Sequence, residues 1–281
     1  MIKNIAYFPS QCAQNSGPVI SAVLDFLQAR GIQTQENSLT SDAAVIWSVL
    51  WSGRMAANRA VYEHYRAHGR PVIVLEIGAL YRGQTWKVAV NHITRDGYYG
   101  HEQDLDWDRP RRLNISLAHK FDGDPAVVIA AQHNRSLQTQ TLGDMTHWVV
   151  QQIQQVRAHT DRPIKIRPHP RSRLELTRLP TDVVIEQPRS VPNTYDSFDM
   201  RFDYHAVINH NSGPGIQAAL AGCRPIVDAS SLAAPVGISM CDIEKPYDLD
   251  RGRWLVEICH TEYTLDELRL GTWFSRIEQA L

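Results

Sequence analysis

Short apolar runs alternate with helical stretches along the first 75 residues of the chain. Residues 5–8, 43–47 and 71–75 are apolar runs with the length of buried strands. Between them, apolar residues recur at helical spacing over residues 17–30 and 55–68, and a glycine follows each of these stretches. This alternation of strands and helices predicts an open, mainly parallel α/β sheet.

A second series of the same kind follows residues 76–117, an irregular stretch rich in Gly, Tyr, Trp, Asn, Arg and His. Strands are predicted at residues 126–131, 163–167, 183–185, 206–208 and 225–227. Helices are predicted at residues 144–159, 171–179, 215–220, 250–260 and 265–281, the last after a capping box of Thr264 and Glu267. We therefore expect an α/β protein with two Rossmann-like domains, residues 1–118 and 119–281. They are expected to face a cleft, with the C-terminal helices packing across.

Composition limits the classes of protein to consider. Lys plus Arg (29) nearly equals Asp plus Glu (30), so net charge argues neither for nor against a nucleic-acid partner. The four cysteines lack C-x-x-C spacing, which favours reduced thiols over a disulfide framework or a zinc site. No apolar run has the length of a membrane span, and the first residues lack a signal-peptide pattern, so we expect a cytoplasmic protein.

The clearest chemical motif lies between residues 206 and 228, where a strand, a polar turn, a helix and a second strand follow one another. A turn between the end of a strand and the start of a helix leaves backbone N–H groups pointing at one place, which suits phosphate. Ser212 and Gly213 would supply these groups, with Asn211 beside them. Gln217, one turn into the helix, is placed to reach a ribose or a base.

Three further polar clusters lie at the ends of predicted strands. They contain Glu76 with His92 and Asp96, then Gln132, and then Arg167 with His169 and Pro170. Taken singly, each is typical of a turn or a solvated loop. Because the carboxyl ends of parallel strands meet at one edge of a sheet, their shared position favours a ligand site there.

These segments resemble, in order and spacing, those of the capsule-polysaccharide synthesis glycosyltransferases of the β-Kdo transferase type. Residues 76–82 (EIGALYR) and 96–99 (DGYY) resemble that family's E-D-G-x-x-R … D-x-x-G-x-Y-Y segment. Residues 132–136 resemble its glutamine-containing segment, residues 167–170 its K-x-H-P motif, and residues 211–225 its S-x-x-G-x-E-A-L-x-x-G-K-P motif. The resemblance extends over about residues 45–230, most of the chain.

This chain departs from the family pattern at three places. Ile77 replaces the second carboxylate of E-D-G, and Gln217 replaces the helix glutamate. Asn134 and Arg135 stand where an aspartate is expected. The resemblance implies a GT-B fold, a metal-independent reaction without a cofactor, and a nucleotide-sugar donor held by the second domain.

Glycosyl transfer requires stabilisation of the leaving phosphate and removal of a proton from the acceptor hydroxyl. We expect the donor to be held by Gln132, Arg167, His169, Pro170, Asn211, Ser212, Gly213 and Gln217. Glu76 is the preferred general base, with Asp96 as the alternative and His92 in reserve. Arg82 and Arg54 are candidates for binding an anionic sugar or acceptor, although Arg82 could also simply pair with Glu76.

Two other functions stay open at this level. A sugar-nucleotide epimerase has the same fold and needs no acceptor, and a non-catalytic nucleotide- or glycan-binding protein would not need Glu76 or Asp96. The acceptor is also open between a saccharide and a hydroxymethylated base in DNA, as in phage-type DNA glycosylation. The basic groups that allow DNA are Arg109, Arg111 and Arg112, and Trp51, Arg54 and Arg59.

Overall fold

The computed structural model describes residues 2–118, 123–176, 179–191, 198–199 and 202–281. The chain forms two compact units. Unit 1 contains Met1–Arg109 and Glu257–Leu281, and unit 2 contains Pro110–Val256. Each unit is built on its own β-sheet.

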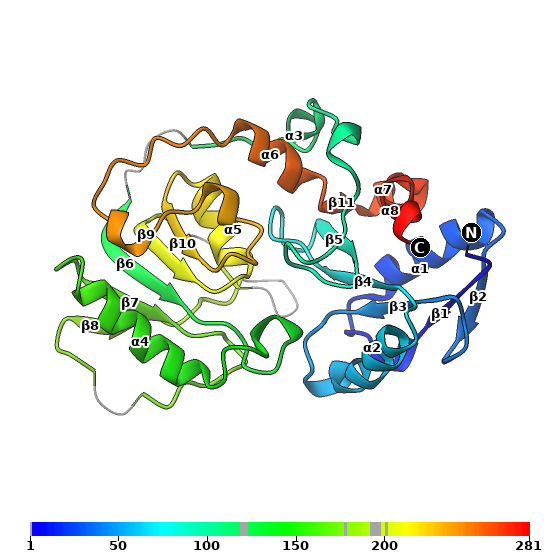
Figure 1. The fold of residues 1–281 in the computed structure, drawn as a ribbon, viewed down its shortest axis with the longest axis horizontal. Helices are drawn as coiled ribbons and strands as arrows, with labels where there is room; N and C mark the ends of the chain where they lie inside the picture. Colours follow the sequence, from blue (N-terminus) through cyan, green and yellow to red (C-terminus); the bar gives the residue numbers. More distant parts are fainter. Residues whose placement is uncertain (1, 119–122, 177–178, 192–197, 200–201) are drawn as a thin grey trace. The chain divides into compact units, whose positions relative to one another are not determined.

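The sheet of unit 1 has six strands in the order β11-β5-β4-β3-β1-β2 (Figure 1). Strands β1 to β4 are parallel, β5 is antiparallel to β4, and β11 is antiparallel to β5. The bounds are β1 (Asn4–Tyr7), β2 (Gln33–Glu36), β3 (Ala43–Trp47), β4 (Val72–Ile77), β5 (Thr85–Val90) and β11 (Glu262–Thr264). All five residues of β3 are buried, as expected for a central strand.

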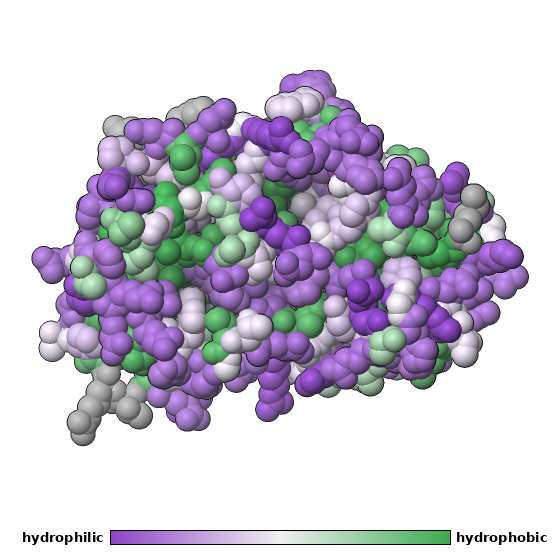
Figure 2. Space-filling model, viewed as in Figure 1, coloured by the Kyte–Doolittle hydropathy of each residue, from purple (hydrophilic) through white to green (hydrophobic). Residues whose placement is uncertain are grey.

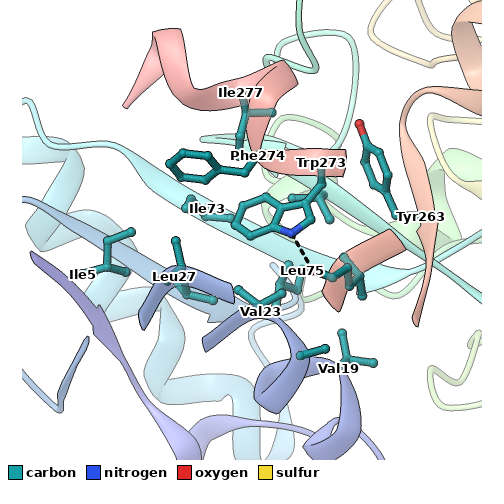
Figure 3. Packing of buried hydrophobic residues seen from close by; sticks show 14 of the residues in the cluster. Ile5, Val19, Val23, Leu27, Ile73, Leu75, Tyr263, Trp273, Phe274 and Ile277 are labelled. Atoms are coloured by element: carbon teal, nitrogen blue, oxygen red, sulfur yellow. Dashed lines mark hydrogen bonds between the residues drawn. The ribbon is translucent and has the colours of Figure 1, made fainter. Parts of the chain in front are cut away.

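The core of unit 1 combines residues from both ends of the chain. Its helices are α1 (Gly17–Ala29), α2 (Asn58–Ala67), α7 (Leu265–Leu270) and α8 (Thr272–Ile277). Figure 3 shows Trp273 and Phe274 of α8 packed with Leu27 of α1 and Leu75 of β4. The indole N–H of Trp273 donates to the carbonyl oxygen of Leu268 at 3.1 Å. The C-terminal helices therefore complete the core on which the N-terminal sheet depends.

Unit 2 has five parallel strands in the order β10-β9-β6-β7-β8. Alternate residues of β6 point to opposite faces. Val127 and Ile129 pack with helix α4 on one face, whereas Val128 and Ala130 pack with α5 on the other. The bounds are β6 (Asp124–Ala130), β7 (Ile164–Arg167), β8 (Val183–Ile185), β9 (Tyr204–Asn209), β10 (Arg224–Val227), α4 (Met145–Arg157) and α5 (Gly213–Leu220).

Shorter elements connect these layers. Helices α3 (Arg109–Arg112) and α6 (Gly252–Cys259) lie where the chain passes from one unit to the other. The described 3-10 helices are η1 (Pro9–Gln11), η2 (Gly53–Ala57), η3 (Glu102–Asp104), η4 (Leu137–Thr139), η5 (Ala234–Val236), η6 (Met240–Asp242) and η7 (Glu278–Ala280). None of the helices in the described residues is both long and apolar enough to cross a membrane. Hydrophilic side chains predominate on the face shown in Figure 2.

The predicted fold class is confirmed, but three details differ. Residues 257–281 were assigned to the second domain, and they belong to unit 1 because β11 extends its sheet and α7 and α8 fill its core. The stretch 76–117, predicted to be irregular, contains β5. The helix predicted at 171–179 is wrong, since the described residues of that segment are not helical. The capping box of Thr264 and Glu267 is confirmed at the start of α7.

Candidate functional site

Polar residues collect at the carboxyl ends of four neighbouring strands in unit 2. Gln132 and His133 follow β6, His169 follows β7, Asn211 follows β9, and Asp228 follows β10. Because these strands are parallel, all of these residues lie at the same edge of the sheet. Within unit 2, Gln132, His169 and Asn211, which were predicted to hold the donor, therefore lie at one edge of the sheet.

Two of the predicted donor residues hold the loops of this edge together. The backbone N–H of Asn211 donates to Gln132 Oε1 at 2.7 Å, and Gln132 Nε2 donates back to Asn211 Oδ1 at 3.1 Å. Gln138 Nε2 donates to the carbonyl oxygen of Asn211 at 3.1 Å, and Asn211 Nδ2 donates to Ser230 Oγ at 2.9 Å. Gln132 and Asn211 are both buried. This network of amide hydrogen bonds fixes the segments that follow β6 and β9 relative to each other.

Helix α5 begins at Gly213, two residues earlier than predicted. Asn209 Oδ1 accepts the backbone N–H of Ser212 at 2.8 Å and its hydroxyl at 3.2 Å, so the Ser212 N–H that was predicted to face phosphate is bonded within the protein. A Cβ on Gly215 would lie 2.8 Å from Val227 Cγ1, so glycine allows the helix to approach β10 closely. The first turn of α5 and its half-buried Gln217 are therefore held firmly against the sheet.

His169 has a neighbour that was not among the predicted site residues. Its ring centroid lies 5.2 Å from that of His133, and the two planes meet at 79°. Burial and, next, the charges of Arg171 and Arg135 lower the pKa of His133. His133 is therefore uncharged at neutral pH and able to donate one ring N–H. Pro170, which follows His169, is exposed.

Arg167, which was expected to contact phosphate, has protein partners. Its guanidinium donates to the carboxylate and the carbonyl oxygen of Asp199 and lies 4.8 Å from the ring centroid of Phe202. The residue is only 5% exposed, so its charge is neutralised inside unit 2. We therefore assign Arg167 a structural role, anchoring the chain at Asp199.

In unit 1, Glu76 lies at the carboxyl end of β4. Its Oε2 accepts the hydroxyl of Ser48 at 2.5 Å, and its Oε1 accepts the backbone N–H of Ile77 at 2.9 Å. Ser48 directly follows β3 and has a positive φ of 65°, a strained conformation for a serine. Both carboxylate oxygens of Glu76 are therefore oriented by fixed donors. Such strain at a residue that holds a carboxylate is typical of a functional site.

A buried charged cluster lies beside Glu76. Lys87 on β5 is directly opposite Glu76 on one side and Glu262 of β11 on the other. Burial lowers the pKa of Lys87, while Glu262 and Glu76 act in the opposite direction. The hydroxyl of Tyr99 is buried with no hydrogen-bond partner among the described residues, and burial and then the charge of Glu262 raise its pKa. Charged and polar side chains are therefore buried beside Glu76, at positions where a structural core would contain apolar residues.

His92 and Asp96 lie away from Glu76, contrary to the prediction that the three form one cluster. Strand β5 is antiparallel, so its end at Val90 pairs with Ile73 at the start of β4, whereas Glu76 is near the other end. Three residues of strand separate the two ends, or about 10 Å. His92 Nδ1 lies 2.7 Å from Thr94 Oγ1, and burial lowers the pKa of the ring despite the nearby Asp96. His92 and Asp96 therefore lie in a turn at the opposite end of β5 from the residue that pairs with Glu76.

The predicted basic residues have different surroundings. Arg54 is exposed in η2. Arg82 is half-buried, and its backbone forms an isolated β-bridge with Thr85. Arg109, one of the basic residues that had allowed a DNA acceptor, is 2% exposed. Its guanidinium donates to the Glu267 carboxylate and to two carbonyl oxygens, including that of Cys259 at 2.6 Å. Arg109 is therefore a structural residue that ties the end of the first segment of unit 1 to the returning chain.

Among the described residues, no three His, Cys, Asp or Glu side chains come together in a way that would hold a metal ion. All four cysteines are free thiols, and Cys12, Cys223 and Cys259 are buried.

No protein-family model matches the sequence, and no curated protein matches it. The fold is similar to that of Thermosulfurimonas dismutans KpsC, beta Kdo 2,4 transferase, with a TM-score of 0.55 and 11% identity over 96% of this chain and 98% of that chain. The beta Kdo 2,7 transferase of the same KpsC has a TM-score of 0.46 at 12% identity, covering 99% and 100%. Methanocaldococcus jannaschii UDP-GlcNAc 2-epimerase has a TM-score of 0.35 at 10% identity, covering 91% and 98%. The first similarity shows a GT-B type of fold with two Rossmann-like domains, and the other two are too distant to support an argument.

Proposed function

We propose that the protein is a glycosyltransferase that moves a sugar from a nucleotide-sugar donor to a hydroxyl acceptor. The observation that carries the proposal is the position of His169 and of the start of α5 at the same carboxyl edge of the unit 2 sheet, on a fold shared with a Kdo transferase. Fold alone does not decide function. The proposal therefore depends on these groups and on the oriented carboxylate of Glu76 in unit 1.

Unit 2 is the proposed donor side. The backbone N–H of Gly213 at the start of α5 and the imidazole of His169 stabilise the negative charge that develops on the leaving phosphate. Gln217, one turn further along α5, is placed to contact the ribose or the base. Gln132 and Asn211 contribute by holding the strand ends in place, as their mutual hydrogen bonds require.

Unit 1 is the proposed acceptor side, with Glu76 as the general base. A base must have a fixed lone pair and must be ionised before the hydroxyl arrives. Ser48 and the N–H of Ile77 hold the carboxylate in one orientation. Arg82, six residues beyond Glu76, is proposed to bind an anionic group of the acceptor.

We propose a saccharide acceptor rather than hydroxymethylated DNA. DNA binding requires accessible positive charge along the phosphate backbone. Arg109 is buried in an ion pair, Arg59 pairs with Glu63 at 2.7 Å, and Trp51 is 8% exposed. Half of the residues that had allowed DNA are therefore engaged elsewhere. Filter binding of hydroxymethylated DNA at low salt is expected to show no more retention than unmodified DNA.

The test separates chemistry from binding. Donors are first selected from a panel of nucleotide sugars by thermal shift, since a ligand of the folded state raises the melting temperature. Glu76→Gln is expected to lower kcat about 10²- to 10⁴-fold with donor affinity unchanged, because only the base is lost. His169→Ala is expected to weaken donor binding about tenfold. Glu63→Gln and His159→Ala, both exposed, are the matched controls.

Each result has a different meaning. Full turnover by Glu76→Gln would place the base elsewhere. Product formed from the nucleotide sugar alone would identify an epimerase. Donor binding without turnover toward any saccharide or DNA acceptor, unaffected by Glu76→Gln, would identify a binding protein and overturn the proposal.

A further inference from the structure

The loops after β6 and β7 repeat one short sequence. Residues 133–136 read His-Asn-Arg-Ser and residues 169–172 read His-Pro-Arg-Ser, so both loops have the pattern His-X-Arg-Ser. β6 and β7 are adjacent and parallel, with Ala130 opposite Arg167 at their ends. The two copies of the pattern therefore emerge side by side at the same edge of the sheet.

The two loops also share a hydrogen-bond geometry. His133 Nδ1 accepts the backbone N–H of Arg135 at 3.0 Å, and His169 Nδ1 accepts that of Arg171 at 3.1 Å. A neutral imidazole whose Nδ1 is an acceptor carries its proton on Nε2, so we assign the Nε2–H tautomer to both rings. The backbone N–H of Asn134 donates to Ser172 Oγ at 3.5 Å and links one loop to the other. The edge thus holds a pair of imidazole N–H groups on one connected scaffold.

Positive charge is concentrated at this pair. Arg135 and Arg171 are exposed, and the charges of both act on His133. Arg135 forms no ion pair in the part of the chain that the structure describes. In contrast, Arg167 beside the pair is neutralised by Asp199. Two guanidinium groups and two imidazole N–H groups brought together are typical of an anion site with more than one negative charge.

We propose that the two His-X-Arg-Ser loops form one pyrophosphate-binding site, with His133 and His169 donating from Nε2 and with Arg135 and Arg171 as counterions. The donor of the proposed transferase is accordingly a nucleoside diphosphate sugar rather than a sugar linked to a nucleoside monophosphate. This inference rests on the proposed function for its sugar, but the pyrophosphate site itself does not require that any transfer occurs.

Titration calorimetry on the full chain tests the site with inorganic phosphate, inorganic pyrophosphate, and the pairs UMP with UDP and CMP with CDP. The wild type is expected to bind pyrophosphate, and to bind at least one diphosphate about tenfold or more tightly than its monophosphate. His133→Ala and Arg135→Ala are each expected to reduce pyrophosphate affinity about tenfold. His133→Gln, which keeps an N–H donor, is expected to recover part of the loss. The control is His147→Ala, since His147 lies on α4 and its ring contacts Gln151.

The outcomes distinguish this inference from the proposed function. Pyrophosphate affinities of His133→Ala and Arg135→Ala within twofold of the wild type would overturn the site. Arg135 is exposed, so Arg135→Ala remains informative even if His133→Ala does not fold, as judged by its melting curve. Transfer from a monophosphate-linked donor would overturn this inference and leave the glycosyltransferase standing. Diphosphate binding that depends on both loops, without transfer to any acceptor, would support the pyrophosphate site and overturn the glycosyltransferase.

Discussion

At the residue scale, Glu262 is a fully buried carboxylate of unit 1 that accepts hydrogen bonds from three residues. It is 0% exposed and accepts the N–H groups of Ala79 and Leu80 at 2.6 Å and 3.0 Å and the hydroxyl of Thr85 at 2.7 Å. A Cβ on Gly78 would lie 2.3 Å from Glu262 Oε2, so the chain leaves room for this carboxylate only with glycine there. Glu262 thus fixes the loop that follows Glu76.

Glu262→Gln is expected to destabilise the protein by about 2–4 kcal/mol, because an amide nitrogen would face donors that need an acceptor and Lys87 would lose one of its two neighbouring carboxylates. Urea unfolding measures the change, with Glu278→Gln as the control. The Glu278 side chain is 44% exposed, and its ion pair with Arg30 is long, at 3.8 Å. Losing this pair is therefore expected to cost under about 1 kcal/mol. Equal stability of the two variants would show that the Glu262 hydrogen bonds contribute little.

Candidate site residues can be predicted from the sequence where they stand at the end of a predicted strand. Glu76, Gln132, His169 and Asn211 were predictable because each directly follows or ends an apolar run. The role of Ser48 was not, since it depends on a positive φ that no neighbouring residue signals. The partnership of His133 with His169 had a visible signal, the repeated His-X-Arg-Ser, but it becomes meaningful only once β6 and β7 are known to be neighbours.

At the scale of elements, the strands that were predictable are those that are buried and continuous in sequence. Strand β3 and the cores of β4, β6 and β9 are apolar runs, and each was predicted near its observed place. Strand β2 has the sequence Gln-Thr-Gln-Glu and lies at a sheet edge, so its polar residues gave no sign of it. Strand β11 has three residues and exists by pairing with β5, a contact far away in sequence.

The contact that links the start of β7 to the segment after η6 is expected to weaken in acid. Glu244 accepts Arg162 Nε at 2.7 Å and Nη2 at 2.9 Å, and these bonds lower its pKa from 4.5 to about 2. Because the folded-state pKa lies below the unfolded one, the stabilisation is complete above about pH 4.5 and is lost as the pH falls toward 2. Both side chains are partly exposed, so its size is about 0.5–1 kcal/mol after solvent screening.

Melting temperatures of the wild type and Glu244→Gln, measured from pH 6 to pH 3, test this contact. The difference between the two proteins is expected to be constant above pH 5 and to shrink below pH 4.5. Other carboxylates titrate in both proteins and cancel in the difference. Asp266→Asn is the control, since Asp266 is 84% exposed in its pair with Arg269. A difference that stays the same at pH 3 would contradict the assignment.

At the scale of the whole molecule, the chain leaves unit 1 and later returns to it. The returning segment brings Tyr263, Leu268, Trp273 and Ile277 into the core, all between 0% and 1% exposed. It also brings Glu267, the partner of buried Arg109. The first boundary was predicted at residue 118, whereas the two units divide after Arg109. The return could not be predicted, because the apolar face of an amphipathic helix does not indicate which sheet it covers. Unit 2, by contrast, is continuous in sequence.

This topology predicts that the two units respond differently to truncation. A chain ending at residue 256 lacks β11, α7 and α8, so the apolar face of α1 and β4 that they cover would be open to water. Losing several buried aromatic and aliphatic side chains costs more than the 5–15 kcal/mol by which a domain is typically stable. Unit 1 is therefore expected to unfold in this fragment. Residues 110–256 keep both core clusters of their sheet and are expected to fold alone.

Circular dichroism and urea unfolding of fragments 1–256 and 110–256 measure this, with the intact chain as reference. Fragment 110–256 should unfold cooperatively, and fragment 1–256 should show that same transition and no other. A synthetic peptide of residues 257–281 is expected to restore the missing transition of fragment 1–256, because it supplies the strand, the core residues and the partner of Arg109 together. If fragment 1–256 unfolded in two transitions without the peptide, the first 109 residues would form a complete domain. The C-terminal segment would then be an addition to unit 1 and not part of its core.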